Sequence, residues 1–214
     1  MTETNQFIEF LMQEDVLKFG EFTLKSGRIS PYFFNLGEVN SGAAFSRLGE
    51  AYADCIMANN IEFDVLFGPA YKGIPIAVAT AVALAQRGVN VGVAYNRKEA
   101  KDHGEGGQLV GAPVSGRVLL IDDVLTSGKA IREAVEIIRG TSAEIVGAMI
   151  AMDRQELNDE GVTAVGGLAS ELGAPVMSIA NLTDLISYLS TSNTLDTEAW
   201  LAGVQEYQRT YCAL

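Results

Sequence analysis

The chain has 214 residues, of which 48% are hydrophobic and 20% charged, and a formal net charge of −12. This composition describes one globular domain over residues 1–214 and excludes a disordered, collagen-like or disulfide-stabilised chain. Residues 140–214 contain 10 acidic and 2 basic residues, so −8 of the charge lies there. Because polyanion binding needs a broad basic face, we expect neither nucleic acid nor a membrane as a partner.

The start of the chain, its apolar runs and its cysteines favour a cytoplasmic protein. Residues 1–6 carry one acid and no base, whereas a secretory signal begins with basic residues. The longest nearly unbroken apolar run, Ile74 to Ala85, has about 12 residues, against roughly 20 in a membrane helix. Cys55 and Cys212 show neither metal-site spacing nor a convincing pairing, as expected in a reducing compartment.

The N-terminal region predicts a helix and then a strand hairpin. Thr4 is the expected cap of the helix, whose apolar residues fall on one face. Short strands at 22–24 and 32–36 flank a turn with the sequence Lys-Ser-Gly-Arg. A second helix is expected over 42–57.

From residue 64 onward, short apolar runs rich in β-branched residues alternate with helical patterns. Runs without polar alternation indicate a parallel sheet covered on both faces, so we predict an α/β fold with a Rossmann-like core. The predicted strands are 64–67, 91–95, 118–121, 145–152 and 176–179, and the predicted helices are 74–87, 130–139, 182–189 and 198–209, with a long polar loop after residue 95. Ligands of such sheets bind beyond the carboxyl ends of the strands, which directs attention to the loops after residues 67, 95, 121 and 152.

The loop after Ile121 is the most informative of these. It reads Asp122-Asp123-Val124-Leu125-Thr126-Ser127-Gly128-Lys129-Ala130 and leads into a helix. Carboxylates at a strand end accept hydrogen bonds from sugar hydroxyls, and the free N–H groups of a helix N-terminus face an anion. The loop therefore predicts a sugar phosphate site. The alternative is a helix N-cap beside two solvated acids.

This loop does not fit a nucleoside triphosphate P-loop. Asp123 occupies the position five before Gly128, where that motif requires glycine. Ala130 follows Lys129, where the motif requires serine or threonine. A dinucleotide fingerprint is likewise missing after every predicted strand, so neither class of nucleotide is expected.

The polar loop after residue 95 is rich in cations. Within seven residues it contains three bases, Arg97, Lys98 and Lys101, and the only histidine, His103. Nearby glycines permit a mobile lid, and a cationic lid can close over an anionic group and exclude water. The alternative is a solvated surface loop, which is the usual structure of a charge run.

Two other loops carry side chains suited to anions. In the loop Gly68-Pro69-Ala70-Tyr71-Lys72-Gly73, backbone N–H groups and Lys72 can meet an anion, although a plain tight turn is the alternative. Arg154 follows the strand 145–152, and the planar fork of arginine suits a carboxylate. A surface ion pair with Glu156 is the alternative there.

The hairpin places Lys25 in its turn and two adjacent aromatic residues, Phe33 and Phe34, in its second strand. Neighbours on a strand face opposite ways, so at most one of these rings can stack on a flat ligand. We expect the other ring to pack inward, as most phenylalanines do.

Taken in order, these segments resemble the motifs of the type I phosphoribosyltransferases, and in particular of orotate phosphoribosyltransferases. The resemblance covers nearly the whole chain. Ser127 and Lys129 replace residues that are usually alanine and threonine in orotate enzymes, but neither change removes a backbone N–H. The resemblance implies the fold of this family, with a small hood over about residues 1–40, a core over about 41–190, a C-terminal helix over about 195–210 and a mobile catalytic loop.

The resemblance also implies a role for each segment. The acids hold the ribose hydroxyls, the turn after them cradles the 5-phosphate, and the cationic loop and the loop of Lys72 cover the diphosphate. The residues implied to bind phosphoribosyl diphosphate are Lys25, Tyr71, Lys72, Arg97, Lys98, Lys101, His103, Asp122, Asp123, Val124, Leu125, Thr126, Ser127, Gly128, Lys129 and Ala130. Those implied to bind orotate are Lys25, Phe33, Phe34, Thr126 and Arg154, and those implied in catalysis are Arg97, Lys98, Lys101, His103, Asp122 and Asp123.

The activity implied is transfer of the phosphoribosyl group to orotate in pyrimidine biosynthesis, with Mg²⁺ held mainly by the substrate and a homodimer that shares its active sites. His103 is expected to act either as a proton donor or as an electrostatic contact. One alternative is a phosphoribosyltransferase for another nucleobase. The other is a regulator that senses phosphoribosyl diphosphate without catalysis, but the first 20 residues lack the basic segment that it would need to bind DNA.

Overall fold

The computed structural model describes residues 2–101, 107–125, 128–191 and 195–213. The strands are β1 (Leu17–Thr23), β2 (Ile29–Phe34), β3 (Val65–Gly68), β4 (Gly92–Lys101), β5 (Gly107–Gly111), β6 (Arg117–Val124), β7 (Glu144–Asp153) and β8 (Val176–Asn181). The helices are α1 (Glu3–Gln13), α2 (Gly42–Ala58), α3 (Gly73–Gln86), α4 (Lys129–Arg139), α5 (Ala164–Leu172), α6 (Leu182–Thr191) and α7 (Leu195–Tyr211), with a short 3-10 helix at Leu36–Glu38.

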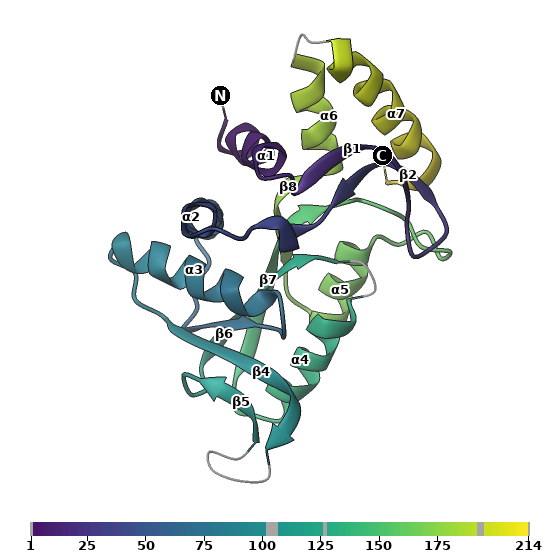
Figure 1. Ribbon diagram of the computed structural model, residues 1–214. Helices are drawn as coiled ribbons and strands as arrows, with labels where there is room; N and C mark the ends of the chain where they lie inside the picture. The colour runs from purple at the N-terminus through teal and green to yellow at the C-terminus, as the bar shows by residue number, and fades with distance from the viewer. Residues whose placement is uncertain (1, 102–106, 126–127, 192–194, 214) are drawn as a thin grey trace.

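The predicted α/β fold is confirmed. The larger sheet has the strand order β5-β4-β3-β6-β7-β8, and β1 and β2 form a separate antiparallel hairpin (Figure 1). Neighbouring strands from β4 to β8 are parallel, and β5 runs antiparallel to β4 at the edge. The order reverses between β3 and β6, which is where a sheet of this kind opens a crevice for ligands.

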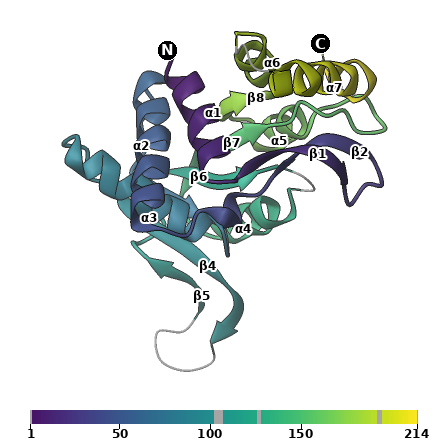
Figure 2. The ribbon, with the colours of Figure 1, turned by 45° about the horizontal axis from the view of Figure 1, so that its top comes forward.

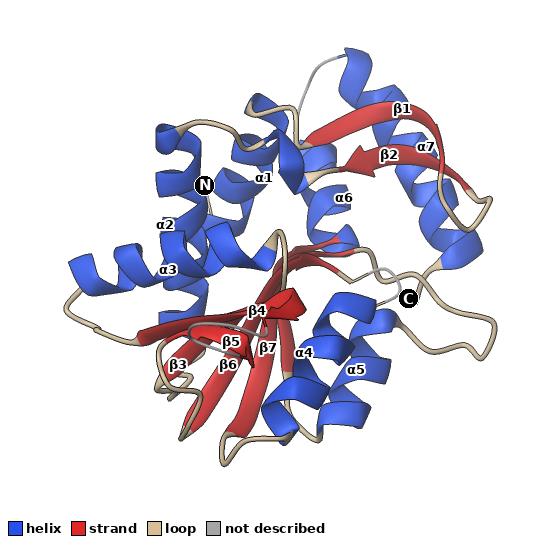
Figure 3. Cartoon of the chain, turned by 60° about the horizontal axis from the view of Figure 1, so that its bottom comes forward, coloured by secondary structure: helices blue, strands red, loops and turns tan. Residues whose placement is uncertain are grey.

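Successive side chains of the central strands pack alternately into two hydrophobic cores, one on each face of the sheet. Leu66 and Leu119 belong to the cluster that includes α2 and α3, whereas Phe67 and Leu120 belong to the cluster that includes α4. Consecutive residues of a strand point to opposite faces, so a strand that is apolar throughout must be covered on both sides. Figure 3 shows α2 and α3 on one side of the sheet and α4 and α5 on the other.

The N-terminal hairpin packs on the C-terminal helix. The ring of Phe19 on β1 stacks on Trp200 of α7 with centroids 4.4 Å apart, and Tyr32 on β2 meets Tyr207 of α7 edge to face at 6.1 Å. Figures 1 and 2 show β1 and β2 beside α7, so the N-terminal hairpin and the C-terminal helix lie together above the carboxyl side of the sheet.

The hairpin strands lie earlier than predicted, at Leu17–Thr23 and Ile29–Phe34, and the helices differ from the prediction in three respects. The first helix begins at Glu3 and its cap is Thr2, whose hydroxyl accepts a hydrogen bond from the Asn5 N–H at 3.2 Å. The last helix begins near residue 195, earlier than predicted. Helix α5 was not predicted, because its Gly-Gly pair weakens the helical pattern, although Thr163 caps its start and a left-handed Gly173 ends it.

The predicted polar loop after residue 95 is in large part a β-ribbon. Strand β4 continues to Lys101 and pairs with β5, so Arg97 and Lys98 lie in a strand. The sequence shows the charges of this segment but not the antiparallel partner that satisfies its backbone groups. In the part of the chain that the structure describes, no helix is long and apolar enough to cross a membrane.

Candidate active site

Asp122 and Asp123 end the central strand β6 and are almost completely buried, with 8% and 7% of their surfaces exposed. The N–H of Asp123 donates to Asp122 Oδ1 at 3.0 Å, and the N–H of Val124 donates to Asp123 Oδ1 at 2.8 Å. The hydroxyl of Tyr52, on α2, donates to the carbonyl of Asp122 at 2.6 Å. Backbone N–H groups therefore hold the two carboxyl groups at the carboxyl end of the sheet, and the buried Tyr52 fixes the backbone of Asp122.

The two acids do not have equal environments. Burial, and secondarily the charge of Asp123, raise the pKa of Asp122 to about 7, although the N–H of Asp123 and the ammonium of Lys72 act against this rise. Asp123 has a direct cationic partner, because Lys72 Nζ lies 2.8 Å from its Oδ2. The pair thus offers one charge-neutralised carboxylate and one carboxyl group that titrates near neutral pH.

Lys72 belongs to the loop between β3 and α3, which the structure folds tightly against β6. A Cβ atom on Gly68 would collide with the carbonyl of Gly73, and one on Gly73 would lie 2.8 Å from the Ile121 carbonyl. The peptide bond between Ala70 and Tyr71 is cis. This packing brings Lys72 from the end of β3 to the acids at the end of β6.

Asn35 is a site residue that the sequence interpretation missed. Its Oδ1 accepts a hydrogen bond from Lys72 Nζ at 3.3 Å, and its Nδ2 donates to Glu38 at 3.2 Å. A single asparagine after a strand carries no recognisable motif, so only the fold reveals this contact between the hood and the core.

Lys98, on the β4–β5 ribbon, lies beside the loop of Lys72. Lys98 Nζ lies 4.7 Å from the centre of the Tyr71 ring, which is 67% exposed. Asn96, buried on the same strand, accepts a hydrogen bond from the Ala70 N–H at 3.1 Å and so joins β4 to the loop of Lys72. His103 and the side chain of Lys101 fall outside the described residues.

The N-terminus of α4 faces the same region. Gly128 precedes the helix with φ of 64°, a left-handed conformation that suits glycine. The first N–H groups of a helix have no partner within the helix and can face an anion. Lys129 is directed along the outside of the helix, with Nζ 3.7 Å from Glu133. Thr126 and Ser127 lie outside the described residues.

The two phenylalanines of the hairpin differ in burial, as expected. Phe34 is buried in the core, whereas Phe33 is 39% exposed and stacks on Phe22 with ring centroids 5.4 Å apart. Lys25 is exposed in the turn between β1 and β2, and no described contact joins it to Asp122 or Asp123.

Arg154 lies just beyond β7 and is buried, which corrects the alternative of a surface ion pair. It does contact Glu156, with Nε 2.6 Å from Oε1, but only 8% of Arg154 is exposed. Its Nη2 donates to Ser30 Oγ at 3.0 Å, and its guanidinium lies 4.2 Å from the centre of the Tyr32 ring. Burial of an arginine requires such partners, and here two of them come from the hairpin.

A model of the phosphoribosyl transferase domain matches residues 36–163 of this sequence. The chain belongs to the phosphoribosyltransferase family. A curated relative from Aeromonas salmonicida (strain A449), named orotate phosphoribosyltransferase, is 53% identical over 209 residues and 96% of each chain is covered. Another from Thioalkalivibrio sulfidiphilus (strain HL-EbGR7), with the same name, is 52% identical and 98% of each is covered.

Solved structures of the family agree with the fold. The crystal structure of orotate phosphoribosyltransferase from Francisella tularensis superposes with a TM-score of 0.87 at 38% identity, covering 97% of this chain and 100% of the other. Adenine phosphoribosyltransferase from Saccharomyces cerevisiae shares the fold with a TM-score of 0.51 at 17% identity, with 80% of this chain covered and 99% of the other. Since both nucleobase types occur on one fold, the fold alone does not decide the base.

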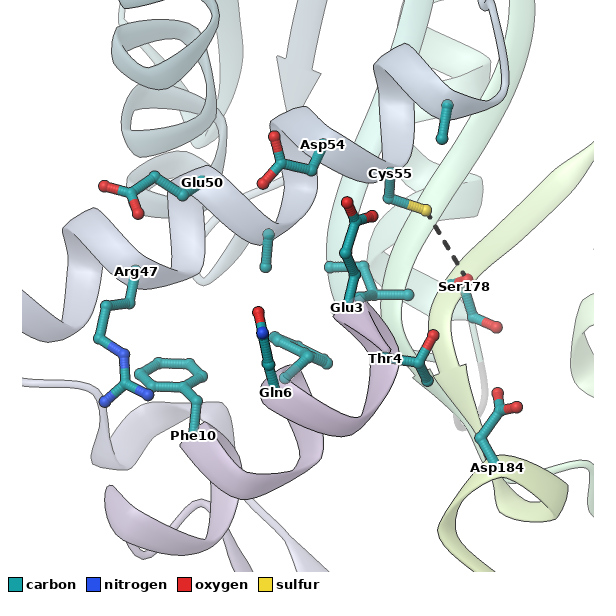
Figure 4. Close-up of a pocket in the computed structure, with 14 residues that line it drawn as sticks. Glu3, Thr4, Gln6, Phe10, Arg47, Glu50, Asp54, Cys55, Ser178 and Asp184 are labelled. Carbon is teal, nitrogen blue, oxygen red and sulfur yellow. Dashed lines mark hydrogen bonds between the residues drawn. The ribbon is translucent and has the colours of Figure 1, made fainter. Parts of the chain in front are cut away.

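A separate groove, of about 480 Å³, lies between α1, α2, β8 and α6, away from the residues above (Figure 4). Its lining contains one base, Arg47, and four acids: Glu3, Glu50, Asp54 and Asp184. A strongly anionic phosphoribosyl diphosphate would be repelled by this lining, whereas the site at Lys72 and Lys98 presents cations. The cations at the carboxyl end of the sheet therefore suit such a ligand better than this groove does.

Proposed function

We propose that this protein transfers the 5-phosphoribosyl group from phosphoribosyl diphosphate to orotate, forming orotidine 5′-phosphate and diphosphate in pyrimidine biosynthesis. The observation that carries the proposal is the acidic pair at the end of β6, which faces Lys72 and precedes the N-terminus of α4. Its support for orotate as the base comes from the full-length relatives, which bear that name at about half identity.

In this proposal Asp122 and Asp123 accept hydrogen bonds from the ribose hydroxyls. The backbone from Val124 to Ala130 cradles the 5-phosphate at the start of α4, where peptide N–H groups and the helix dipole favour an anion. The side chain of Lys129 is directed elsewhere, so we expect the cradle to depend on backbone groups.

The diphosphate is expected to lie against Tyr71, Lys72, Arg97, Lys98, Lys101 and His103. Lys72 is paired with Asp123 without ligand, at 2.8 Å, and a bound diphosphate would offer its ammonium a more highly charged partner. For His103 we propose one of two roles, proton donor to the diphosphate or electrostatic contact with it.

The residues present suit Mg²⁺ bound through the substrate. Among the described residues, no three His, Cys, Asp or Glu side chains form a group that could hold a metal ion. Asp122 and Asp123 supply oxygen donors of the kind that Mg²⁺ prefers, but Asp123 is already engaged by Lys72. Mg²⁺ on the diphosphate would neutralise charge on the leaving group.

Orotate is expected between the hairpin and the end of β7. Arg154 would receive its carboxylate, the exposed ring of Phe33 or the backbone beside Phe34 would contact the flat base, and Lys25 and Thr126 would complete the contacts. During reaction the bond between the anomeric carbon and the diphosphate oxygen breaks, and the anionic ring nitrogen of orotate forms the new bond to that carbon. Negative charge grows on the diphosphate, where the cations of the site stabilise it.

We further propose a homodimer with shared active sites. Helix α3 is apolar nearly all round, yet Val78 and Val82 are 47% and 55% exposed in the single chain. A helix of this composition is normally buried on every side, so a second copy is the occupant that we assign to this face. The exposed ring of Tyr71 lies just before this helix, which would place the interface beside the active site. We also expect a cytoplasmic location, as predicted from the sequence.

The decisive experiment adds phosphoribosyl diphosphate and Mg²⁺ to the protein with orotate and follows the absorbance of orotate. We expect consumption of orotate and formation of orotidine 5′-phosphate. A panel of adenine, hypoxanthine and uracil, each tested in the same way, is the control for base identity. Turnover of another base in preference to orotate would replace the proposal with the alternative transferase, and no turnover of any base would favour the regulator.

A further inference from the structure

The environment of Arg154 extends to the C-terminal helix. Tyr207 of α7 donates its hydroxyl to Glu156 Oε1 at 2.8 Å, the same oxygen that accepts from Arg154 Nε at 2.6 Å. Burial and the neighbouring Glu156 raise the pKa of Tyr207 to about 12, so its hydroxyl keeps the proton that it donates. One carboxylate oxygen is thus shared between the arginine and the tyrosine.

We propose that Glu156 and Tyr207 are positioning residues that orient Arg154 toward the carboxylate of orotate and so set the preference for a carboxylated base. The inference rests on the proposed function, because it takes Arg154 as the group that meets this carboxylate. Neither residue is proposed to touch the substrate. Both act through the orientation of one guanidinium.

The contacts of Glu156 explain why its orientation depends on the hydroxyl of Tyr207. The other oxygen of Glu156 lies 4.0 Å from Arg28 Nη1, so a second cation competes for the same carboxylate. The hydrogen bond from the Tyr207 hydroxyl keeps Oε1 of Glu156 next to Arg154. Without the hydroxyl, Glu156 is free to turn toward Arg28, and Arg154 then loses the partner that fixes the plane of its guanidinium.

The guanidinium retains capacity for a ligand in this arrangement. An arginine has five N–H donors, more than its bonds to Glu156 and Ser30 use. The carboxylate of Glu156 neutralises the buried positive charge of Arg154. The centre of the Tyr32 ring lies 4.2 Å from the guanidinium, and the ring packs on its face. Residues that fix a buried donor in advance reduce the entropy lost when a ligand binds.

The end of α7 and the segment after β7 are joined by further bonds. The N–H of Leu157 donates to the Tyr211 carbonyl at 2.8 Å, and the N–H of Ala213 donates to the Gln155 carbonyl at 2.9 Å. The thiol of Cys212 contacts the Arg154 carbonyl at 3.6 Å. The backbone that carries Arg154 and Glu156 is therefore fixed to the same helix that supplies Tyr207.

The test compares binding of orotidine 5′-phosphate and uridine 5′-phosphate, which differ only in the carboxylate, by titration calorimetry of the full chain. We expect wild type to prefer orotidine 5′-phosphate. Tyr207→Phe should weaken its binding about tenfold, the effect of one lost hydrogen bond in a charged network, and leave uridine 5′-phosphate unchanged. Tyr211→Phe is the matched control, since it removes a hydroxyl from the same helix where the ring covers Arg28.

A double-mutant cycle separates positioning from general loosening of the helix. In an Arg154→Ala background, Tyr207→Phe should have no further effect on either nucleotide. Equal weakening of both nucleotides, an unchanged preference, or an effect that persists without Arg154 would each overturn the positioning role. If wild type itself shows no preference for the carboxylated nucleotide, the proposed orotate site fails, and this inference fails with it.

Discussion

At Asp122 the requirements of ligand binding and of stability conflict. Ribose hydroxyls need an acceptor at the end of β6, yet burial makes the charged carboxylate costly and raises its pKa to about 7. The unfolded chain ionises this group near pH 3.9. Between these values the folded state binds more protons than the unfolded state, so the free energy of unfolding falls as the pH rises.

We therefore expect Asp122→Asn to stabilise the protein without ligand. The amide oxygen can still accept from the Asp123 N–H, but the cost of the buried charge disappears. The gain should be small near pH 4 and grow by about 2–4 kcal/mol at pH 8. Denaturant unfolding at both pH values measures it.

Asp159→Asn is the control for this change, because it replaces an exposed carboxylate in the loop after β7. As an exposed substitution, it should change the free energy of unfolding by no more than about 0.5 kcal/mol. A pH-independent effect of Asp122→Asn would contradict the raised pKa. Loss of phosphoribosyl diphosphate binding in the stabilised variant would show that the carboxylate is kept for function.

Lys101 provides a prediction about catalysis at the same scale. Lys101→Ala should lower the turnover number by roughly 10²-fold or more and change orotate binding much less, because the proposed contact strengthens as charge develops on the diphosphate. Steady-state kinetics with both substrates measure this division. Arg209→Ala, which removes an exposed cation that pairs with Glu206, is the charge-matched control. Weaker binding with unchanged turnover would refute the role.

At the scale of elements, the crossing of α2 and α3 sets the position of the Lys72 loop. Gly49 of α2 lies so close to α3 that a Cβ atom would collide with the Ala79 carbonyl. The absence of a side chain lets the two helices approach, and α3 begins immediately after Lys72. Packing between helices therefore helps to place an active-site lysine.

We expect Gly49→Ala to destabilise the protein by about 1–3 kcal/mol, since backbone atoms on α3 cannot yield without moving the helix. Thermal unfolding should show a lower midpoint. Gly42→Ala, at the start of the same helix, meets nothing within 4 Å and should leave the midpoint nearly unchanged. Equal midpoints for the two variants would mean that the helices can separate freely.

The helices and strands also show where a local sequence pattern is sufficient to predict the structure. The strand and helix around Asp122 were predicted because an unbroken apolar run and a following helical pattern are local signals. The start of β4 was predicted at 91–95, but its continuation to Lys101 and its pairing with β5 were not, because the partners lie farther along the chain, as in the pair of Ala94 with Gly111. The charges in that segment favoured the prediction of a loop. In the structure, backbone hydrogen bonds to β5 hold the segment in a strand.

At the scale of the whole molecule, the uneven distribution of charge explains how an acidic protein can bind a small polyanion. The net charge is −12, yet Lys72 and Arg154 follow the carboxyl ends of β3 and β7, and Arg97 and Lys98 lie in the second half of β4. Broad binding of nucleic acid is disfavoured, while one phosphorylated sugar meets a local group of cations.

Shared active sites predict complementation between inactive subunits. A mixture of Lys101→Ala and Asp122→Ala subunits should recover up to about a quarter of wild-type activity, because half of the random dimers are mixed and each has one intact site. Activity of the mixture, compared with each variant alone, measures this recovery.

Val82→Glu, introduced into both variants, is the control for the interface. A charge on the exposed apolar face of α3 should prevent assembly and abolish the recovery, with sedimentation reporting the loss of dimer. No recovery from mixed dimers that are shown to form would exclude shared sites.

The sequence by itself determined the alternation of strands and helices, the acidic pair and its phosphate turn, and the cationic segments, because each is a local pattern of a few residues. Tertiary structure decided which of these meet. Lys72 reaches Asp123 through the packing of the loop after β3 on β6, Asn35 joins them from the hood, and Tyr207 reaches Glu156 across 51 residues. Such contacts depend on the free energy of packing the whole chain, which no local pattern encodes.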